Sequence, residues 1–143
     1  MSDLKGGCHC GNIAANIELS RAAGAYHPRT CDCDFCRKHG ASYLSDPRGS
    51  VRILIKDEQS IGKYRQGSEL ADFLYCKNCG VLVAALYENE GRLYAAVNAA
   101  AVAARADFAE ARPVSPKSLS GTEKAQRWQD AWFADVTVVT QAQ

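Results

Sequence analysis

The chain has 143 residues, of which 47% are hydrophobic and 23% are charged. This length suits one globular domain, and the apolar fraction excludes a disordered tail protein. The formal net charge is only +1, so the chain lacks the strong positive field that gathers nucleic acid or anionic lipid. Its first residues lack the apolar core of a secretory signal. We therefore expect a cytoplasmic protein of one domain, residues 1–143, with no nucleic acid and no membrane as partner.

Alternating apolar and polar residues predict short strands along most of the chain. The expected strands cover residues 12–19, 25–30, 41–44, 51–56, 61–65, 70–75, 81–87, 93–97 and 136–139. Turn-forming residues at 46–49 and 88–91 separate neighbouring strands. Short strands at this close spacing are typical of a mainly antiparallel β domain.

Three segments have the composition of helices. Residues 34–39 are polar enough for one exposed helical turn, which Gly40 would end. Good helix formers fill residues 99–111, and the prolines that follow are expected to end that helix and begin a loop. Residues 122–128 predict another short helix. The fold class we expect is therefore mainly β with short helical segments.

Seven cysteines form three clusters instead of being scattered along the chain. They are Cys8 and Cys10, then Cys31, Cys33 and Cys36, and finally Cys76 and Cys79. An odd number disfavours a disulfide framework, and cysteines so close in sequence make strained disulfides. Thiolates at this spacing can reach one metal ion. A sulfur-only ligand set favours zinc over calcium or magnesium, and an iron–sulfur cluster is the less favoured alternative.

Glycines flank both outer pairs and permit tight turns with positive φ, from which backbone N–H groups can reach metal-bound sulfur. The simplest partition places one zinc ion between these pairs, held by Cys8, Cys10, Cys76 and Cys79. Four sulfurs saturate a tetrahedral ion, so this zinc would be structural and would staple the first strand to a late one. The alternative is a reduced site without metal.

The middle cluster of Cys31, Cys33 and Cys36 cannot fill a tetrahedron by itself. A fourth position would remain for water, a substrate thiol or a histidine, and an open position permits chemistry. We therefore expect a second, catalytic zinc here. Two alternatives stay open: a vacant cluster, and a closed structural site capped by a histidine. The candidate histidines are His9, His27 and His39, and His39 could also shuttle a proton.

These motifs resemble the glutathione-dependent formaldehyde-activating enzyme family, whose domain is shared with a centromere-associated protein. The similarity is carried by residues 7–11, 31–37 and 76–80 in that order, and the tail after about residue 99 matches less well. The resemblance implies a mostly β "tent" fold like that of the Mss4 proteins, in one zinc-binding domain. It also implies a structural zinc at the outer pairs and a catalytic zinc at the triple.

The function implied by the resemblance is that of a carbon–sulfur lyase, similar to S-(hydroxymethyl)glutathione synthase, in formaldehyde detoxification. Such an enzyme adds glutathione reversibly to formaldehyde, and another small thiol or aldehyde is an alternative. Thiol chemistry agrees, because a free thiol with a pKa of about 8.5 loses its proton on binding zinc. Three thiolate ligands also make zinc a poor source of hydroxide at neutral pH.

Cations beside the triple are the expected partners of the two carboxylates of glutathione. Arg37 and Lys38 directly follow the last cysteine of the triple, so we predict them as substrate-binding residues. The rival hypothesis is a zinc-stapled binding or scaffold domain without catalytic turnover. What separates the two hypotheses is whether the metal of the triple has an exchangeable ligand.

Overall fold

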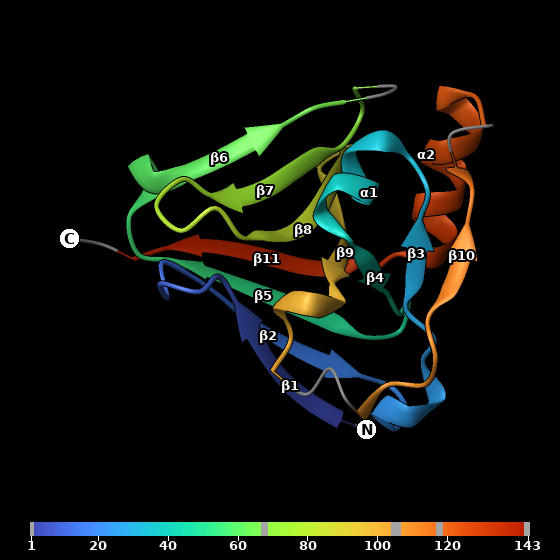
Figure 1. Ribbon diagram of the computed structural model, residues 1–143, viewed down its shortest axis with the longest axis horizontal. Helices are drawn as coiled ribbons and strands as arrows, with labels where there is room; N and C mark the ends of the chain where they lie inside the picture. Colours follow the sequence, from blue (N-terminus) through green and yellow to red (C-terminus); the bar gives the residue numbers. More distant parts are fainter. Residues whose placement is uncertain (1, 67–68, 104–106, 117–118, 142–143) are drawn as a thin grey trace.

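Two β-sheets form the framework of the computed structural model, which describes residues 2–66, 69–103, 107–116 and 119–141 (Figure 1). In spatial order, the first sheet consists of β1 (Ser2–Gly7), β2 (Ile13–Leu19), β5 (Ser50–Ile55) and β11 (Asp135–Thr140). The second consists of β10 (Arg112–Val114), β3 (Arg29–Cys31), β4 (Ser42–Leu44), β9 (Arg92–Asn98), β8 (Leu82–Asn89), β7 (Asp72–Cys76) and β6 (Ile61–Tyr64). The mainly β fold class is confirmed.

Helical segments are few and short. The α-helices of the described residues are α1 (Asp34–His39) and α2 (Gly121–Ala131), and 3-10 turns form at η1 (Ala23–Ala25), η2 (Glu58–Ser60) and η3 (Ala99–Ala101). Helix α1 has the predicted bounds and ends at Gly40 in the left-handed conformation. Within the described ranges, no helix combines the length and the apolar composition that a membrane span requires.

Most strand pairs are antiparallel, as predicted, but each sheet also contains a parallel pair. Strand β11 runs parallel to β5, and β10 runs parallel to β3. Strand β10 contains Pro113, which we expected in a loop; β10 is an edge strand, where proline is tolerated. The sequence does not predict β1, whose residues form a strand through antiparallel pairing with β2, including Leu4 opposite Ile17.

The predicted helix over residues 99–111 is wrong for the part that the structure describes. Helical structure there is limited to η3 and single residues, and residues 104–106 lie outside the described residues. The backbone N–H of Ala103 donates to the carbonyl of Lys5 on β1 at 2.8 Å instead of to a helical partner. Pairing with the first sheet therefore overrides the helix propensity of alanine.

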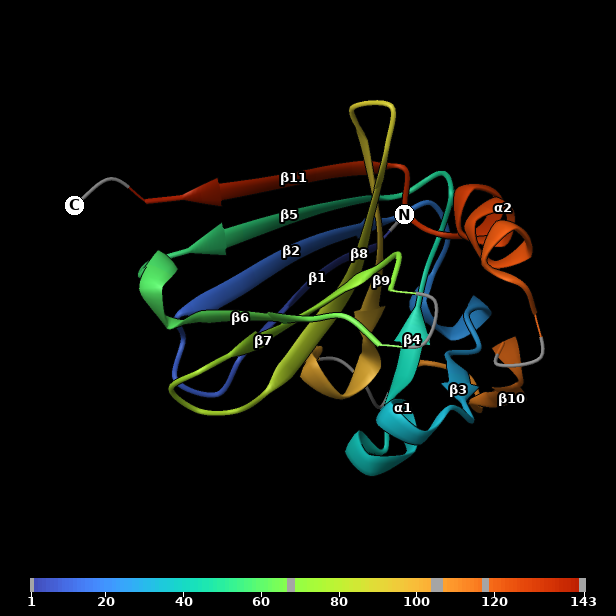
Figure 2. The same ribbon diagram turned by 90° about the horizontal axis from the view of Figure 1, so that it is seen from above.

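The buried residues form two hydrophobic clusters. The first, which we call the interface core, joins both sheets and contains Ile17 and Ile53 of one sheet and Val83 and Val97 of the other. The second, the pocket core, contains Cys31, Cys36, Tyr43, Phe73 and Trp132 among its buried members. In both views α1, α2, β3 and β10 lie at one end of the molecule, while the β1–β2 and β7–β8 turns lie at the other (Figures 1 and 2).

A buried carboxylate fixes the loop between β4 and β5. Asp46 is 5% exposed and accepts hydrogen bonds from the Tyr26 hydroxyl at 2.6 Å, the Ser20 hydroxyl at 2.8 Å and the Ser20 and Arg48 backbone N–H groups. Burial alone would raise the pKa of Asp46, but these donors outweigh it and lower the pKa to about 2. The ionised form therefore stabilises the fold.

Replacing Asp46 by asparagine should lower the free energy of unfolding by about 2 kcal/mol. The side-chain NH2 group of asparagine is itself a donor and would face some of the donors that now bind the carboxylate. A lowered carboxyl pKa means that the stabilisation is complete above the ordinary aspartate pKa of about 4 and is lost only below it. The difference in the free energy of unfolding between the variant and wild type, measured by urea denaturation, should thus be equal at about pH 6 and about pH 8. Asp3→Asn, at an exposed position, is the control; a difference that changes over this range would contradict the assignment.

Candidate metal centres

Four cysteines from two distant segments meet at one end of the molecule. Cys8 and Cys10 lie in the turn after β1, Cys76 ends β7, and Cys79 lies in the turn before β8. All four sulfurs lie within 4.8 Å of one another, with 3.8 Å between Cys8 and Cys10 and 3.5 Å between Cys10 and Cys76. Zinc–sulfur bonds of about 2.3 Å in a tetrahedron place sulfurs about 3.8 Å apart. This set therefore fits one tetrahedral zinc ion.

Backbone N–H groups point at these sulfurs, as expected around metal-bound thiolates. The N–H of Ile13 donates to the sulfur of Cys8 at 3.2 Å. The N–H groups of Cys10 and Val81 lower the pKa of the Cys79 thiol to about 6. The turns thus stabilise the thiolate form that zinc requires.

Glycines shape both turns. Gly11 and Gly80 directly follow the two pairs and have φ of 86° and 81°. Residues with a side chain rarely adopt this backbone conformation. Gly6 has no positive φ; a Cβ there would lie 2.5 Å from the carbonyl oxygen of Ala101. Glycine is therefore needed before the first pair for close approach and after both pairs for backbone conformation.

The middle cluster forms where β3 passes into α1. Cys31 ends β3, Cys33 is the N-cap of α1, and Cys36 lies within the helix. Their sulfurs lie within 4.8 Å of one another, and among the described residues no histidine or carboxylate joins the set. The Cys33 sulfur also accepts the backbone N–H of Cys36 at 3.4 Å. Three sulfurs can therefore hold a metal ion and leave one tetrahedral position for another ligand.

The three histidines have other surroundings. The His39 ring is exposed and packs against Phe35 with 4.7 Å between ring centroids. The Nδ1 atom of His27 lies 2.7 Å from the carbonyl oxygen of Glu110, and His9 is exposed in the β1–β2 turn. None of the three belongs to either cysteine set.

The three middle thiols differ in how readily they lose a proton. A hydrogen bond from Cys36 lowers the pKa of Cys31 to about 6, and the same bond, with burial, raises the pKa of Cys36. The hydroxyl of Tyr43 lies 3.1 Å from the Cys36 sulfur, and burial raises the pKa of this tyrosine above its ordinary value. The cluster therefore holds a thiolate ready for a cation, beside a hydroxyl that stays protonated.

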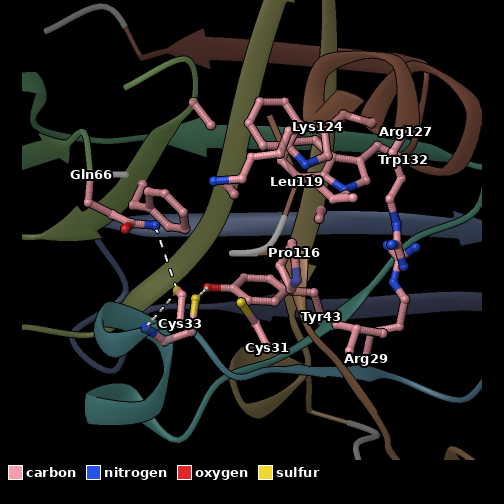
Figure 3. A pocket seen from close by; sticks show the side chains of 17 residues that line it. Arg29, Cys31, Cys33, Tyr43, Gln66, Pro116, Leu119, Lys124, Arg127 and Trp132 are labelled. Atoms are coloured by element: carbon pink, nitrogen blue, oxygen red, sulfur yellow. Dashed lines mark hydrogen bonds between the residues drawn. The ribbon is translucent and has the colours of Figure 1, made fainter. Parts of the chain in front are cut away.

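A cavity of about 230 Å³ opens beside the middle cluster (Figure 3). Its cations are Arg29, Lys124 and Arg127, and its aromatic side chains are Tyr43, Phe73, Trp128 and Trp132. Among the described residues that line it, none is acidic. Figure 3 shows Arg29 and Arg127 together at the side of the cavity opposite Cys33 and Gln66. The cavity thus combines thiols at one side with positive charge at the other.

The two guanidinium groups lie close enough to influence each other. Burial lowers the pKa of Arg29, and the neighbouring charge of Arg127 lowers it further. Arg29 also donates a hydrogen bond to the Ser45 hydroxyl. Like charges held together are stabilised when an anion lies between them, so this side of the cavity favours a carboxylate ligand.

The predicted substrate residues Arg37 and Lys38 are exposed on α1 and are not among the residues that line the cavity. Sequence reasoning missed Arg29 and the two cations of α2. Arg29 carried a signal, because residues two apart on a strand share a face and Arg29 precedes Cys31 by two. The α2 residues carried none, since only tertiary packing brings them to the cysteines.

Comparisons with known proteins agree with this geometry. Residues 3–116 match the family described as glutathione-dependent formaldehyde-activating enzyme. A crystal structure of a Rhodobacter sphaeroides protein, a structural genomics target, is similar with 28% identity and a TM-score of 0.50, covering 68% of this chain and 85% of that chain. Two sheets with two metal-compatible cysteine clusters are consistent with an Mss4-like fold. The family match includes all seven cysteines and ends before α2.

Proposed function

Because this chain belongs to the glutathione-dependent formaldehyde-activating enzyme family, we propose that it is a zinc-dependent carbon–sulfur lyase that adds glutathione reversibly to formaldehyde. One observation carries this proposal: three cysteine sulfurs, without a fourth ligand from the described residues, border a cavity with three cations and no acidic lining residue. The open position suits a substrate thiol, and the cations suit the two carboxylates of glutathione.

Two zinc ions per chain follow from the two sulfur sets. We assign a structural ion to the outer pairs, Cys8, Cys10, Cys76 and Cys79, and a catalytic ion to Cys31, Cys33 and Cys36. When bound, the catalytic zinc supplies the positive charge that keeps a substrate sulfur deprotonated near neutral pH.

Neighbouring side chains hold the middle sulfurs in place. The protonated hydroxyl of Tyr43 contacts Cys36, and the side-chain amide of Gln66 donates to the Cys33 sulfur at 3.7 Å. Such partners fix the orientation of metal-binding sulfurs and reduce the charge on them. Both residues are therefore positioning residues for the cluster.

The reaction makes one bond between sulfur and carbon. The sulfur lone pair adds to the aldehyde carbon, the carbonyl π pair moves to oxygen, and the proton released by the thiol ends on that oxygen. Arg29, Lys124 and Arg127 would bind the carboxylates and aim the thiol at the cluster, so that two reactants meet in a fixed orientation. No oxidant or reductant is needed.

Exchange nuclear magnetic resonance spectra of glutathione and formaldehyde test the proposal. The adduct also forms spontaneously, and these spectra measure how fast it forms and breaks down with and without the protein. Zinc-loaded protein should accelerate the exchange in proportion to its concentration, and an excess of chelator should abolish the acceleration. A folded protein that holds both ions without accelerating the exchange would instead favour the scaffold hypothesis.

Arg127→Ala should raise the KM for glutathione about tenfold, the effect of losing about 1.4 kcal/mol of charged hydrogen bonding. The rate with a neutral thiol such as 2-mercaptoethanol should not change, because that thiol has no carboxylate. Arg37→Ala and Lys38→Ala, on exposed positions of α1, test the sequence prediction in the same assay. A comparable rise in KM in those variants alone would place the carboxylate site on α1.

A further inference from the structure

The cavity has an apolar part that the two proposed substrates do not explain. Glutathione brings charged ends and a thiol, and formaldehyde has a single carbon. The strands β8 and β9 place two alanines, Ala85 and Ala96, directly opposite each other on the cavity floor, and both are almost fully buried. Phe73 on β7 pairs with Ala85 and also lines the cavity. Small side chains at these paired positions create the space.

Trp128 of α2 and Trp132, which directly follows the helix, form the wall above this floor. Trp128 and Trp132 stack with ring centroids 4.9 Å apart and an interplanar angle of 24°, and Tyr87 packs edge-on against Trp128 at 5.2 Å. A capping box between Ser120 and Glu123 fixes the start of the helix. The wall is therefore held by contacts on several sides before any ligand binds.

This wall is not part of what the family match describes. The match ends at residue 116, whereas α2 begins at Gly121. The family resemblance therefore predicts the cysteines but does not predict the shape or chemistry of the space beside them. That space can accept a different electrophile while the thiol chemistry stays the same.

The apolar part of the cavity can accept an electrophile larger than formaldehyde. The whole cavity measures about 230 Å³, and an apolar cavity of roughly 150 Å³ in another protein holds a benzene ring. Glutathione would take the part of the cavity between the cations and the cysteines. Formaldehyde would add only one carbon to the apolar part, whereas flat aromatic walls favour a flat ring in stacked or edge contact. The apolar, aromatic lining of this part thus suits an aromatic group attached to the reacting carbon.

We infer that the aldehyde used by this protein carries an aryl group, which packs between the alanine floor and the tryptophan wall. This inference rests on the proposed thiol addition and specifies its second substrate. The thiol sulfur bonds to the aldehyde carbon, the π pair moves to oxygen, and the proton from the thiol joins it, giving an aryl thiohemiacetal. The class of substrate is therefore an aromatic aldehyde.

Steady-state kinetics with zinc-loaded protein and glutathione compare benzaldehyde with formaldehyde, each corrected for its spontaneous reaction. We expect kcat/KM, divided by the rate constant of the spontaneous reaction, to be at least about tenfold higher for benzaldehyde, because burial of the ring adds binding that formaldehyde lacks. Acceleration with formaldehyde but none with benzaldehyde overturns the inference and leaves the proposed function standing. If neither aldehyde reacts faster, the proposed function fails and the inference fails with it.

Filling the floor tests the location of the ring. Ala96→Leu places extra carbon atoms in the cavity and should lower kcat/KM for benzaldehyde at least tenfold more than for formaldehyde. The control is Leu70→Ala, since Leu70 is an exposed leucine that does not line this cavity; it should leave both values as in wild type. An equal effect of Ala96→Leu on both aldehydes would contradict the assignment.

Tryptophan fluorescence gives a readout on the wild-type protein, which requires neither turnover nor a substituted variant. Both tryptophans of the chain line this cavity, so the intrinsic signal reports on the wall alone. Benzyl alcohol, an unreactive aryl probe, should change the fluorescence in a saturable way, whereas methanol should not. A linear, unsaturable response to benzyl alcohol would overturn the inference.

Discussion

Replacing Cys10 by alanine should unfold the protein at 25 °C. Cys10 is exposed, so its side chain contributes little to packing, and loss of stability must come from the metal. Binding of structural zinc contributes about 10 kcal/mol or more, which is comparable to the whole stability of a domain. We expect loss of far-ultraviolet circular dichroism structure and of the cooperative thermal transition.

His9→Ala provides the matched control for this variant. His9 is exposed, lies between Cys8 and Cys10, and belongs to neither ligand set. The His9→Ala variant should have the melting temperature of wild type and retain two zinc ions per chain. Cys76→Ala should also unfold, but Cys76 is buried in the interface core, so its loss mixes packing with metal binding. A Cys10→Ala protein that keeps the wild-type melting temperature would exclude a stapling zinc.

Replacing Cys33 by serine should abolish catalysis without unfolding the protein. Cys33 caps α1 by accepting the backbone N–H of Cys36, and serine is among the best N-cap residues. The cap is therefore kept while the thiolate is lost. We expect the zinc content to fall from two ions to one, and the rate of glutathione addition to fall at least about 100-fold, since even outer partners of a metal site cost 10–100-fold.

The measurement combines zinc quantification, thermal unfolding and the exchange assay on one preparation. Asp34→Asn is the control, because Asp34 directly follows Cys33 and is exposed outside the cysteine set. It should keep both ions and most of the activity. If Cys33→Ser unfolds, the middle zinc is structural; if it keeps its full rate, the triple is not the catalytic centre.

The cysteine sets were predictable because their constraints are local. One or two residues between two thiols on a turn suffice to aim both at one point, and the glycines beside them mark the turns. The partition of four and three follows from the number of ligands that zinc requires. The structure brings each set within 4.8 Å, as that partition requires.

The cavity was not predictable by the same reasoning. We chose Arg37 because it follows Cys36 in sequence, but one step along a helix rotates a side chain by about 100°, which here leads from the buried side to solvent. Lys124 and Arg127 reach the cavity on α2, 88 and 91 positions after Cys36. No periodicity along the chain encodes that packing.

The same limit explains the wrong helix over residues 99–111. Alanines favour a helix in isolation, but here they follow β9 and must cross to β1, where the carbonyl of Lys5 offers a hydrogen bond to Ala103. Strand β1 was itself not predicted, so this partner was not visible from the sequence. One missed strand therefore produced a second error far away in the chain.

The two hydrophobic clusters have a consequence for how this protein can change during evolution. Cys76 belongs to the interface core, with Cys8 and Cys79 packed against it, whereas Cys31 and Cys36 belong to the pocket core. Mutations in the wall or floor of the cavity therefore act on a cluster that does not contain the cysteines to which we assign the structural zinc. Descendants of this chain can therefore change the lining of the cavity while the core around the outer cysteines stays the same.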